Sequence, residues 1–95
     1  MLLCQVIGTV VATTKSESFR GSKLMLVQER ETNGELIGRI FVATDSVGAG
    51  AGEIVLVATG SAAQAATASH APTDAAIVAI VDAVERDERQ ANRGA

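Results

Sequence analysis

Ser69, His70 and Asp74 are of the residue types that form a hydrolytic triad. In such a triad a serine hydroxyl attacks the substrate, a histidine takes its proton, and an aspartate orients the histidine. Triad residues are held by separate rigid elements beside an oxyanion hole, whereas these three fall within six positions of one segment. The spacing therefore indicates an exposed histidine in a loop and not a catalytic centre.

A glycine-rich segment, residues 44–52, reads TDSVGAGAG and suggests a second kind of chemistry. Clustered backbone N–H groups at glycines can bind a phosphate. A dinucleotide fingerprint would need a third glycine at the position of Glu53 and a helix after it, and a P-loop would need Gly-Lys-Ser/Thr. Because neither the dinucleotide fingerprint nor the P-loop motif is present, the segment indicates a tight turn that another stretch of backbone can approach closely, and not a nucleotide site.

Metal binding and disulfide formation find little support in the sequence. The single cysteine, Cys4, stands 66 positions from the single histidine, which is no ligand spacing that we recognise, and it has no partner for an internal disulfide. We expect no metal and no cofactor, and a reducing cytosol. Acid–base catalysis by carboxylates stays a weaker alternative to hydrogen bonding of turn N–H groups. The carboxylates that border predicted strands are Asp45, Glu53, Asp74 and Asp82.

Length and composition restrict the chain to one folded domain. It has 95 residues, and Leu, Ile, Val and Phe make up 25 of them, which is above the level of disordered chains. Eleven acidic and eight basic residues leave a net charge of −3, and only Phe19 and Phe41 are aromatic. A nucleic-acid binder would need a basic surface and stacking side chains, so nucleic acid is not expected as a partner.

The longest apolar run, residues 75–81, is far shorter than the roughly 20 residues of a membrane-spanning helix, so no membrane association is expected.

The order of elements predicts an all-β fold. Five β-rich segments, residues 2–13, 23–28, 36–43, 53–58 and 74–82, are expected to be strands. Asn33-Gly34 predicts a tight hairpin turn, and Ser61 could cap a short helical turn. Residues 14–22 read as a loop, and the charged residues 85–95 as a frayed helix or disordered tail after a domain of residues 1–84. These features favour a small five-stranded antiparallel barrel or a sandwich.

Three of these segments do not alternate apolar with polar residues. Residues 24–27, 54–57 and 76–81 are apolar on both faces of the expected strands. A strand on the surface of a monomer would present polar side chains outward, and large exposed apolar patches are rare in soluble monomers. We therefore expect the outer faces to be covered by other subunits.

Five sequence blocks in order resemble the EutN/CcmL family, the pentameric vertex proteins of bacterial microcompartment shells. They are V-x-G-x-V-V-A-T-x-K at residues 6–15, G-x-K-L-x-x-V-Q at 21–28, D-S-V-G-A-G-x-G-E at 45–53, V-L-V-x-x-G-S at 55–61, and P-x-D-A-x-I-V-x-I-V-D at 72–82. The resemblance implies a five-stranded OB-like barrel and a cyclic homopentamer. It also implies a structural role without catalysis, at the vertices of a shell in the bacterial cytoplasm. It also implies hexameric shell proteins as partners.

The resemblance further assigns residues to roles. It implies that the glycine-rich loop faces the five-fold axis, where the candidates to line a central opening are Val47, Gly48, Ala49 and Gly50. Residues expected at subunit interfaces or in structural roles are Gly8, Lys15, Gly21, Asp45, Glu53, Gly60, Ser61, Asp74 and Asp82.

The chain departs from the family pattern at several positions, and two other functions stay open. Gln64 stands where the family usually has arginine, so an ion pair made there would be missing. Ala79 replaces a common glycine and Phe19 a common leucine, and both are compatible with the fold. The alternatives are a small OB-type module that binds an oligonucleotide or oligosaccharide, and a small enzyme that uses Asp45 or His70.

Overall fold

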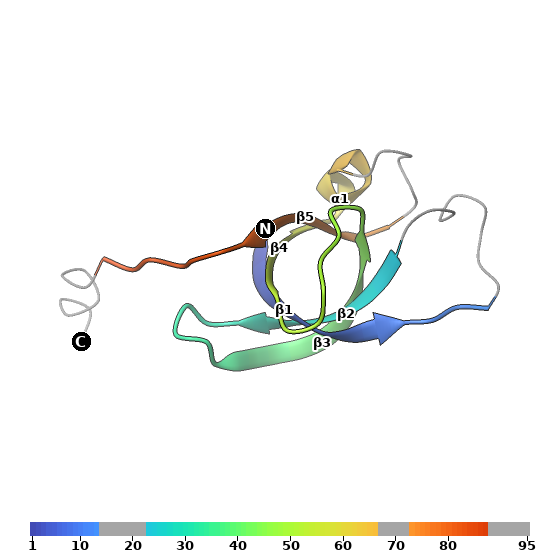
Figure 1. The fold of residues 1–95 in the computed structure, drawn as a ribbon. Coiled ribbons are helices and arrows are strands. Elements are labelled where there is room, and N and C mark those ends of the chain that lie inside the picture. The colour runs from blue at the N-terminus through green and yellow to red at the C-terminus, as the bar shows by residue number, and fades with distance from the viewer. Residues whose placement is uncertain (14–22, 67–72, 88–95) are drawn as a thin grey trace.

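The computed structural model describes residues 1–13, 23–66 and 73–87. Its strands form one barrel with a short helix on its outside (Figure 1). The elements are β1 (Leu2–Val10), β2 (Lys23–Arg30), β3 (Leu36–Asp45), β4 (Ile54–Thr59), α1 (Ser61–Ala66) and β5 (Ala75–Val81). The predicted all-β barrel with one helical turn is confirmed.

The barrel closes in the order β1-β2-β3-β5-β4, and one of its five pairings corrects the expectation of a wholly antiparallel barrel. Four pairings are antiparallel, but β3 and β5 run parallel through Thr44↔Ala76 and Asp45↔Ile77. The reason is topological: strand direction cannot alternate around a closed ring with an odd number of strands. At least one parallel pair is therefore required, and this pair is also the shortest.

The interior is small and aliphatic. The largest fully buried side chains are Val6, Val27, Val55, Val57 and Cys4, which come from three different strands. Neighbouring positions of the same strands, such as Leu26 and Leu56, are only half-buried, as the alternation of strand side chains requires. Because the barrel is narrow, mid-sized β-branched side chains fill it without an aromatic centre.

The hairpin between β2 and β3 has the predicted Asn-Gly turn within a connection of residues 31–35. Gly34 N donates to Glu31 O at 3.0 Å, Glu31 N to Glu35 O at 2.8 Å, and the Asn33 side chain accepts from Glu35 N at 3.0 Å. Gly34 has φ of +97°, the left-handed conformation that glycine adopts without penalty. A second positive φ, +67° at Gly38, coincides with a register shift, so a bulge bends β3 just after the turn.

Strand ends differ from the expected bounds by one to three residues. β1 ends at Val10 and not at residue 13, and β3 extends to Asp45, where pairing with β2 and β5 continues beyond the expected end. Residues 83–87 form neither helix nor strand and lead away from the barrel (Figure 1). No helix in the described ranges is long and apolar enough to cross a membrane. Several predicted features lie outside the described residues: Lys15, Phe19, Gly21, Ser69, His70 and most of the tail.

Candidate functional site

The glycine-rich loop that joins β3 to β4, residues 46–53, begins at a buried carboxylate. Asp45 is 2% exposed, and its Oδ1 accepts hydrogen bonds from Val47 N at 3.0 Å and Gly48 N at 3.2 Å. Its Oδ2 accepts from Ala49 N at 2.8 Å. Hydrogen bonds from backbone N–H groups to a carboxylate offset the cost of burying the charge. Asp45 is therefore a structural anchor that sets the path of the loop.

The other end of the loop is fixed to its own turn and to β1. Glu53 Oε1 accepts from Gly50 N at 2.6 Å, and Glu53 N donates to Gly50 O at 3.1 Å. Gly52 N donates to Val6 O at 2.8 Å, and Val6 N donates to Glu53 O at 2.9 Å. The yellow-green segment in Figure 1 crosses the end of the barrel in this way, and most of its backbone N–H groups are bonded within the subunit.

Not every glycine of the loop has the same role. Gly48 and Gly52 have φ of +87° and +86°, so side chains there would strain the backbone. Gly50 has no positive φ, but an added Cβ would lie 3.3 Å from Glu53 Oε1. The expected tight turn is confirmed, and its left-handed positions are the first and third of the three alternating glycines.

The four residues predicted to line an opening do not present equal surfaces. Ala49 is 3% exposed and belongs to the hydrophobic core of its own barrel, because the loop turns this side chain inward. Val47 is 43% exposed, and the space where a Gly48 side chain would stand is empty. Of these four residues, the ones on the outward surface of the loop are thus Val47, with its side chain, and Gly48 and Gly50, with their backbone.

The remaining predicted residues are spread over the barrel. Gly60 N donates to Asp74 O at 3.0 Å and Gly60 has φ of +65°, so these two residues join the start of α1 to the start of β5. Ser61 is the first residue of α1, Gly8 stands beside a register shift in β1, and Asp82 follows β5 on the surface. Asp45 and Glu53 lie at the two ends of the loop, and Gly60 is bonded to Asp74 where α1 and β5 begin. The structure does not gather all of the predicted residues into one site.

The described side chains offer little covalent or metal chemistry. No group of three His, Cys, Asp or Glu residues within the described ranges could hold a metal ion. Burial, reinforced by the charge of Glu29, raises the pKa of the Cys4 thiol from 9.0 to about 11, so it stays protonated and a poor nucleophile near neutral pH. Asp45 and Glu53 are engaged with backbone N–H groups, which fits structural anchoring.

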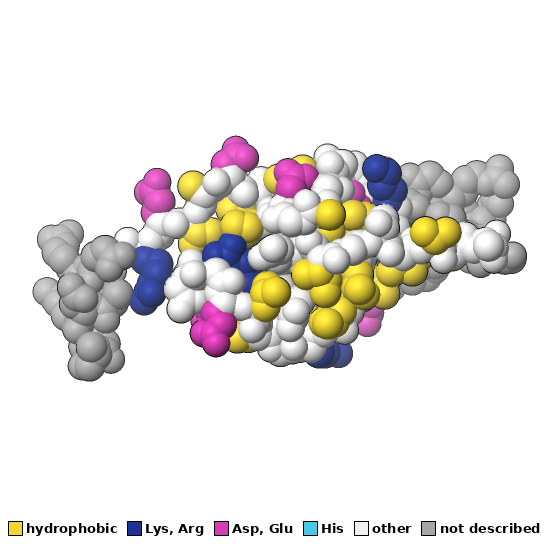
Figure 2. Space-filling view, turned by 60° about the horizontal axis from the view of Figure 1, so that its bottom comes forward, with side chains coloured by type: hydrophobic (Ala, Val, Ile, Leu, Met, Phe, Trp, Pro, Cys, Tyr) yellow, Lys and Arg dark blue, Asp and Glu magenta, His cyan; other side chains and the backbone are white. Residues whose placement is uncertain are grey.

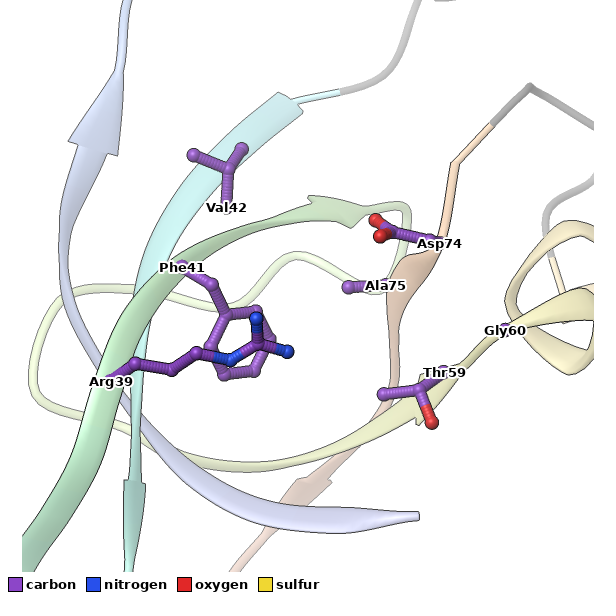
Figure 3. Close-up of a pocket in the computed structure, with 7 residues that line it drawn as sticks. All are labelled: Arg39, Phe41, Val42, Thr59, Gly60, Asp74 and Ala75. Atoms are coloured by element: carbon purple, nitrogen blue, oxygen red, sulfur yellow. The ribbon is translucent and has the colours of Figure 1, made fainter.

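A hollow of about 430 Å³ next to β3 is a feature that the sequence interpretation missed. It lies between Arg39, Phe41 and Val42 on β3 and the corner where β4 ends and β5 begins (Figure 3). The Arg39 guanidinium lies over the Phe41 ring, 5.5 Å from its centroid. The i, i+2 spacing of Arg39 and Phe41 places both on one face of a strand and was the available sequence signal. The corner residues on the other side are Thr59, Gly60, Asp74 and Ala75.

Comparison with known proteins places these features in a family. The profile of the family described as "Ethanolamine utilisation protein EutN/carboxysome" matches residues 1–82. The bacterial microcompartment shell vertex protein GrpN of Rhodospirillum rubrum is 49% identical over 86 residues, which are 90% of this chain and 97% of GrpN. The carboxysome shell vertex protein CcmL of Synechocystis sp. is 48% identical over 85 residues, 88% of this chain and 85% of CcmL.

The likeness extends to three dimensions. The solved structure of the GrpN pentameric microcompartment shell protein from Rhodospirillum rubrum has a TM-score of 0.81 to this chain at 46% sequence identity. The alignment covers 90% of this chain and 100% of that chain.

Proposed function

Since the match over residues 1–82 makes this chain a member of the EutN/CcmL family, we propose that five copies of it form a ring that occupies a vertex of a bacterial microcompartment shell. The role is that of a structural, non-catalytic shell protein, in line with the relatives GrpN and CcmL, which are named shell vertex proteins. The observation that carries the proposal is the likeness to the pentameric GrpN over nine-tenths of the chain.

The outer surface of the barrel supports the ring independently. Apolar side chains gather on the face formed by β1, β2 and β3 (Figure 2), where Ile40 is 53% and Val42 43% exposed. Exposed apolar surface of this kind is typical of a surface that another protein covers. In a cyclic ring each subunit uses two different patches, one toward each neighbour, so apolar surface on more than one strand pair is expected.

The partners at the rim of the ring are proposed to be hexameric shell proteins. Hexagonal layers alone stay flat, and a five-fold unit at each corner supplies the curvature that closes a polyhedron. Each rim contact can be weak, because five identical contacts act together. We place such a shell, and this chain within it, in the bacterial cytoplasm.

The central opening is proposed to be lined by the outward surface of the glycine-rich loop. Val47 is the side chain that supports this placement, because it is exposed while its loop neighbour Ala49 is buried. Oxidation of a Val47→Cys variant should then produce disulfide-linked subunits within one ring. The unsubstituted chain is the control, since Cys4 is buried with a raised pKa and should not react. A variant that assembles but forms no crosslinks would place the loop away from the axis.

The proposed function is tested by assembling shells with and without this chain. Co-expression with its hexameric shell proteins should give closed polyhedra by electron microscopy, and omission should give sheets, tubes or shells with open corners. Leakage of an encapsulated small substrate measures the same difference, and re-supplying the chain separately should restore tightness. Equally closed and equally tight shells without any vertex protein would contradict the role, and an OB-type binding module would become the better interpretation.

A further inference from the structure

The seam between β3 and β5 leaves most of one strand edge open. β3 pairs with β2 along its length, from Lys23↔Asp45 to Arg30↔Leu36, but with β5 only at Thr44 and Asp45. Among the described strands, residues 36–43 therefore have no partner on the β5 side. An open strand edge presents unpaired N–H and C=O groups to whatever approaches it.

The hollow beside this edge is amphipathic and carries two charges. Phe41, half-buried against the core, and the buried Ala75 supply apolar surface, while Arg39 and Asp74 are exposed (Figure 3). Within the described part of the chain, no carboxylate pairs with the Arg39 guanidinium and no donor meets the Asp74 carboxylate. Stacking over Phe41 holds the guanidinium plane while its N–H groups stay available, and an arginine so placed suits recognition of a carboxylate.

The hollow is continuous with the apolar outer face of the barrel. Val42 borders the hollow and also belongs to that face. Cross-strand partners place the members of the face together: Leu26 is opposite Val42, and Val10 is opposite Leu24. An apolar centre beside a rim with arginine and an aromatic ring has the composition of a protein–protein interface. The residues of this apolar outer face are Val10, Leu24, Leu26, Ile40 and Val42.

We propose that the hollow at Arg39 and the adjoining apolar outer face form the surface on which a second copy of this chain docks, with Arg39 fixing the alignment through a carboxylate of that copy. The inference rests on the proposed ring, which requires that each subunit receive a neighbour on one surface and offer a different one on the other side. The acidic balance of the chain, eleven acidic against eight basic residues, makes carboxylates available on a second copy.

Two pairs of matched variants test the docking surface. Arg39→Glu is compared with Arg86→Glu, an equal charge change in the exposed segment after β5. Val42→Asp is compared with Val11→Asp, which puts the same carboxylate at an 88% exposed position beyond β1. Native mass spectrometry over a dilution series gives the protomer concentration at half-assembly, and circular dichroism shows that each variant is folded. Both Arg39 and Val42 are exposed in the single chain, so their substitution should leave the barrel intact.

The expected result is a shift of the half-assembly concentration by about 30-fold or more for Arg39→Glu and Val42→Asp, and by less than about threefold for the controls. Arg39→Lys should lie between, because a lysine keeps the charge and loses the planar pair of donors. Hydrogen exchange at residues 36–43 should slow on assembly. If the unsubstituted chain is pentameric and folded Arg39→Glu and Val42→Asp assemble as it does, the docking surface is wrong while the ring stands. A monomeric unsubstituted chain overturns both.

Discussion

At the residue scale, the two loop carboxylates show how a side chain that resembles a catalytic group can serve as a scaffold. Asp45 accepts hydrogen bonds from three backbone N–H groups and Glu53 accepts one, so the acids at the two ends of the glycine-rich loop satisfy four of its backbone donors. The sequence interpretation, which favoured turn hydrogen bonding over acid–base catalysis for the carboxylates at strand ends, holds for these two. It could not specify which N–H groups each would bind, because that depends on the path of the folded loop.

Replacement of Asp45 by asparagine should destabilise the fold. An amide has one acceptor oxygen, so its NH₂ group would oppose either Ala49 N–H or the N–H groups of Val47 and Gly48. We expect a loss of about 2–3 kcal/mol in the free energy of unfolding, measured by urea titration at one fixed protomer concentration. The control is Glu35→Gln at an exposed turn position, which should change stability by less than about 0.5 kcal/mol. Similar losses in both variants would show that the Asp45 hydrogen bonds add little.

The raised pKa of the buried Cys4 thiol predicts how the free energy of unfolding depends on pH. Well below pH 9 the Cys4 thiol is protonated in both the folded and the unfolded state, so its contribution to stability does not change with pH. Between pH 9 and about 11 the unfolded chain releases this proton while the folded chain retains it, so stability falls as pH rises, by about 2–3 kcal/mol in total. Unfolding titrations of the unsubstituted chain and of Cys4→Ala, compared at each pH, isolate this contribution. Parallel stability curves for the two proteins above pH 9 would contradict it.

At the scale of elements, the sequence predicts individual strands and turns, but it does not predict the contacts that form only when the barrel closes. The five strands, the hairpin at Asn33-Gly34 and the glycine turn follow from residue periodicity and turn chemistry. The parallel β3–β5 pair and the hollow beside Arg39 depend on contacts between segments that are distant in the sequence, which composition and spacing do not encode. The inward turn of Ala49 belongs to the same class, because it depends on where the loop crosses the barrel.

Alanine substitutions in the glycine-rich loop can separate the effect of backbone strain from that of steric clashes by the added methyl group. Gly48→Ala and Gly52→Ala should each lower the free energy of unfolding by about 1–2 kcal/mol, because both residues have positive φ while an added Cβ would meet no atom within 4 Å. The matched control is Gly8→Ala, whose Cβ would lie 3.8 Å from Leu26 in ordinary contact and whose φ is not positive. Chemical denaturation should show the control within about 1 kcal/mol of the unsubstituted chain. Equal stability of all three variants would mean that the loop relaxes around the substitutions.

At the scale of the whole molecule, the barrel gives each side of the subunit a different character. At the end crossed by the glycine-rich loop, most backbone N–H groups are bonded within the subunit and Val47 is exposed, whereas the β1–β2–β3 side is apolar next to a charged hollow. Such a subunit is suited to a ring, in which unlike surfaces meet, more than to a two-fold dimer, in which one surface meets itself. The strands that are apolar on both faces in the sequence thus provide an outer surface that a neighbouring subunit of the proposed vertex ring can cover.

The charged C-terminal segment should be dispensable for that ring. Residues 85–95 contain six charged side chains and no large apolar residue, so they have little surface to bury against a neighbour. Residues 83–87 add neither a strand nor a helix to the barrel, and the family match ends at residue 82. A chain truncated after Val84 should therefore retain the pentamer at a half-assembly concentration within about threefold of the full chain, by native mass spectrometry over a dilution series. A matched chain with residues 85–95 replaced by a Gly/Ser segment of equal length separates the effect of charge from that of length. If truncation dissociates the ring and the Gly/Ser segment fails to restore it, the tail docks on a neighbouring subunit, and the domain boundary at residue 84 is wrong.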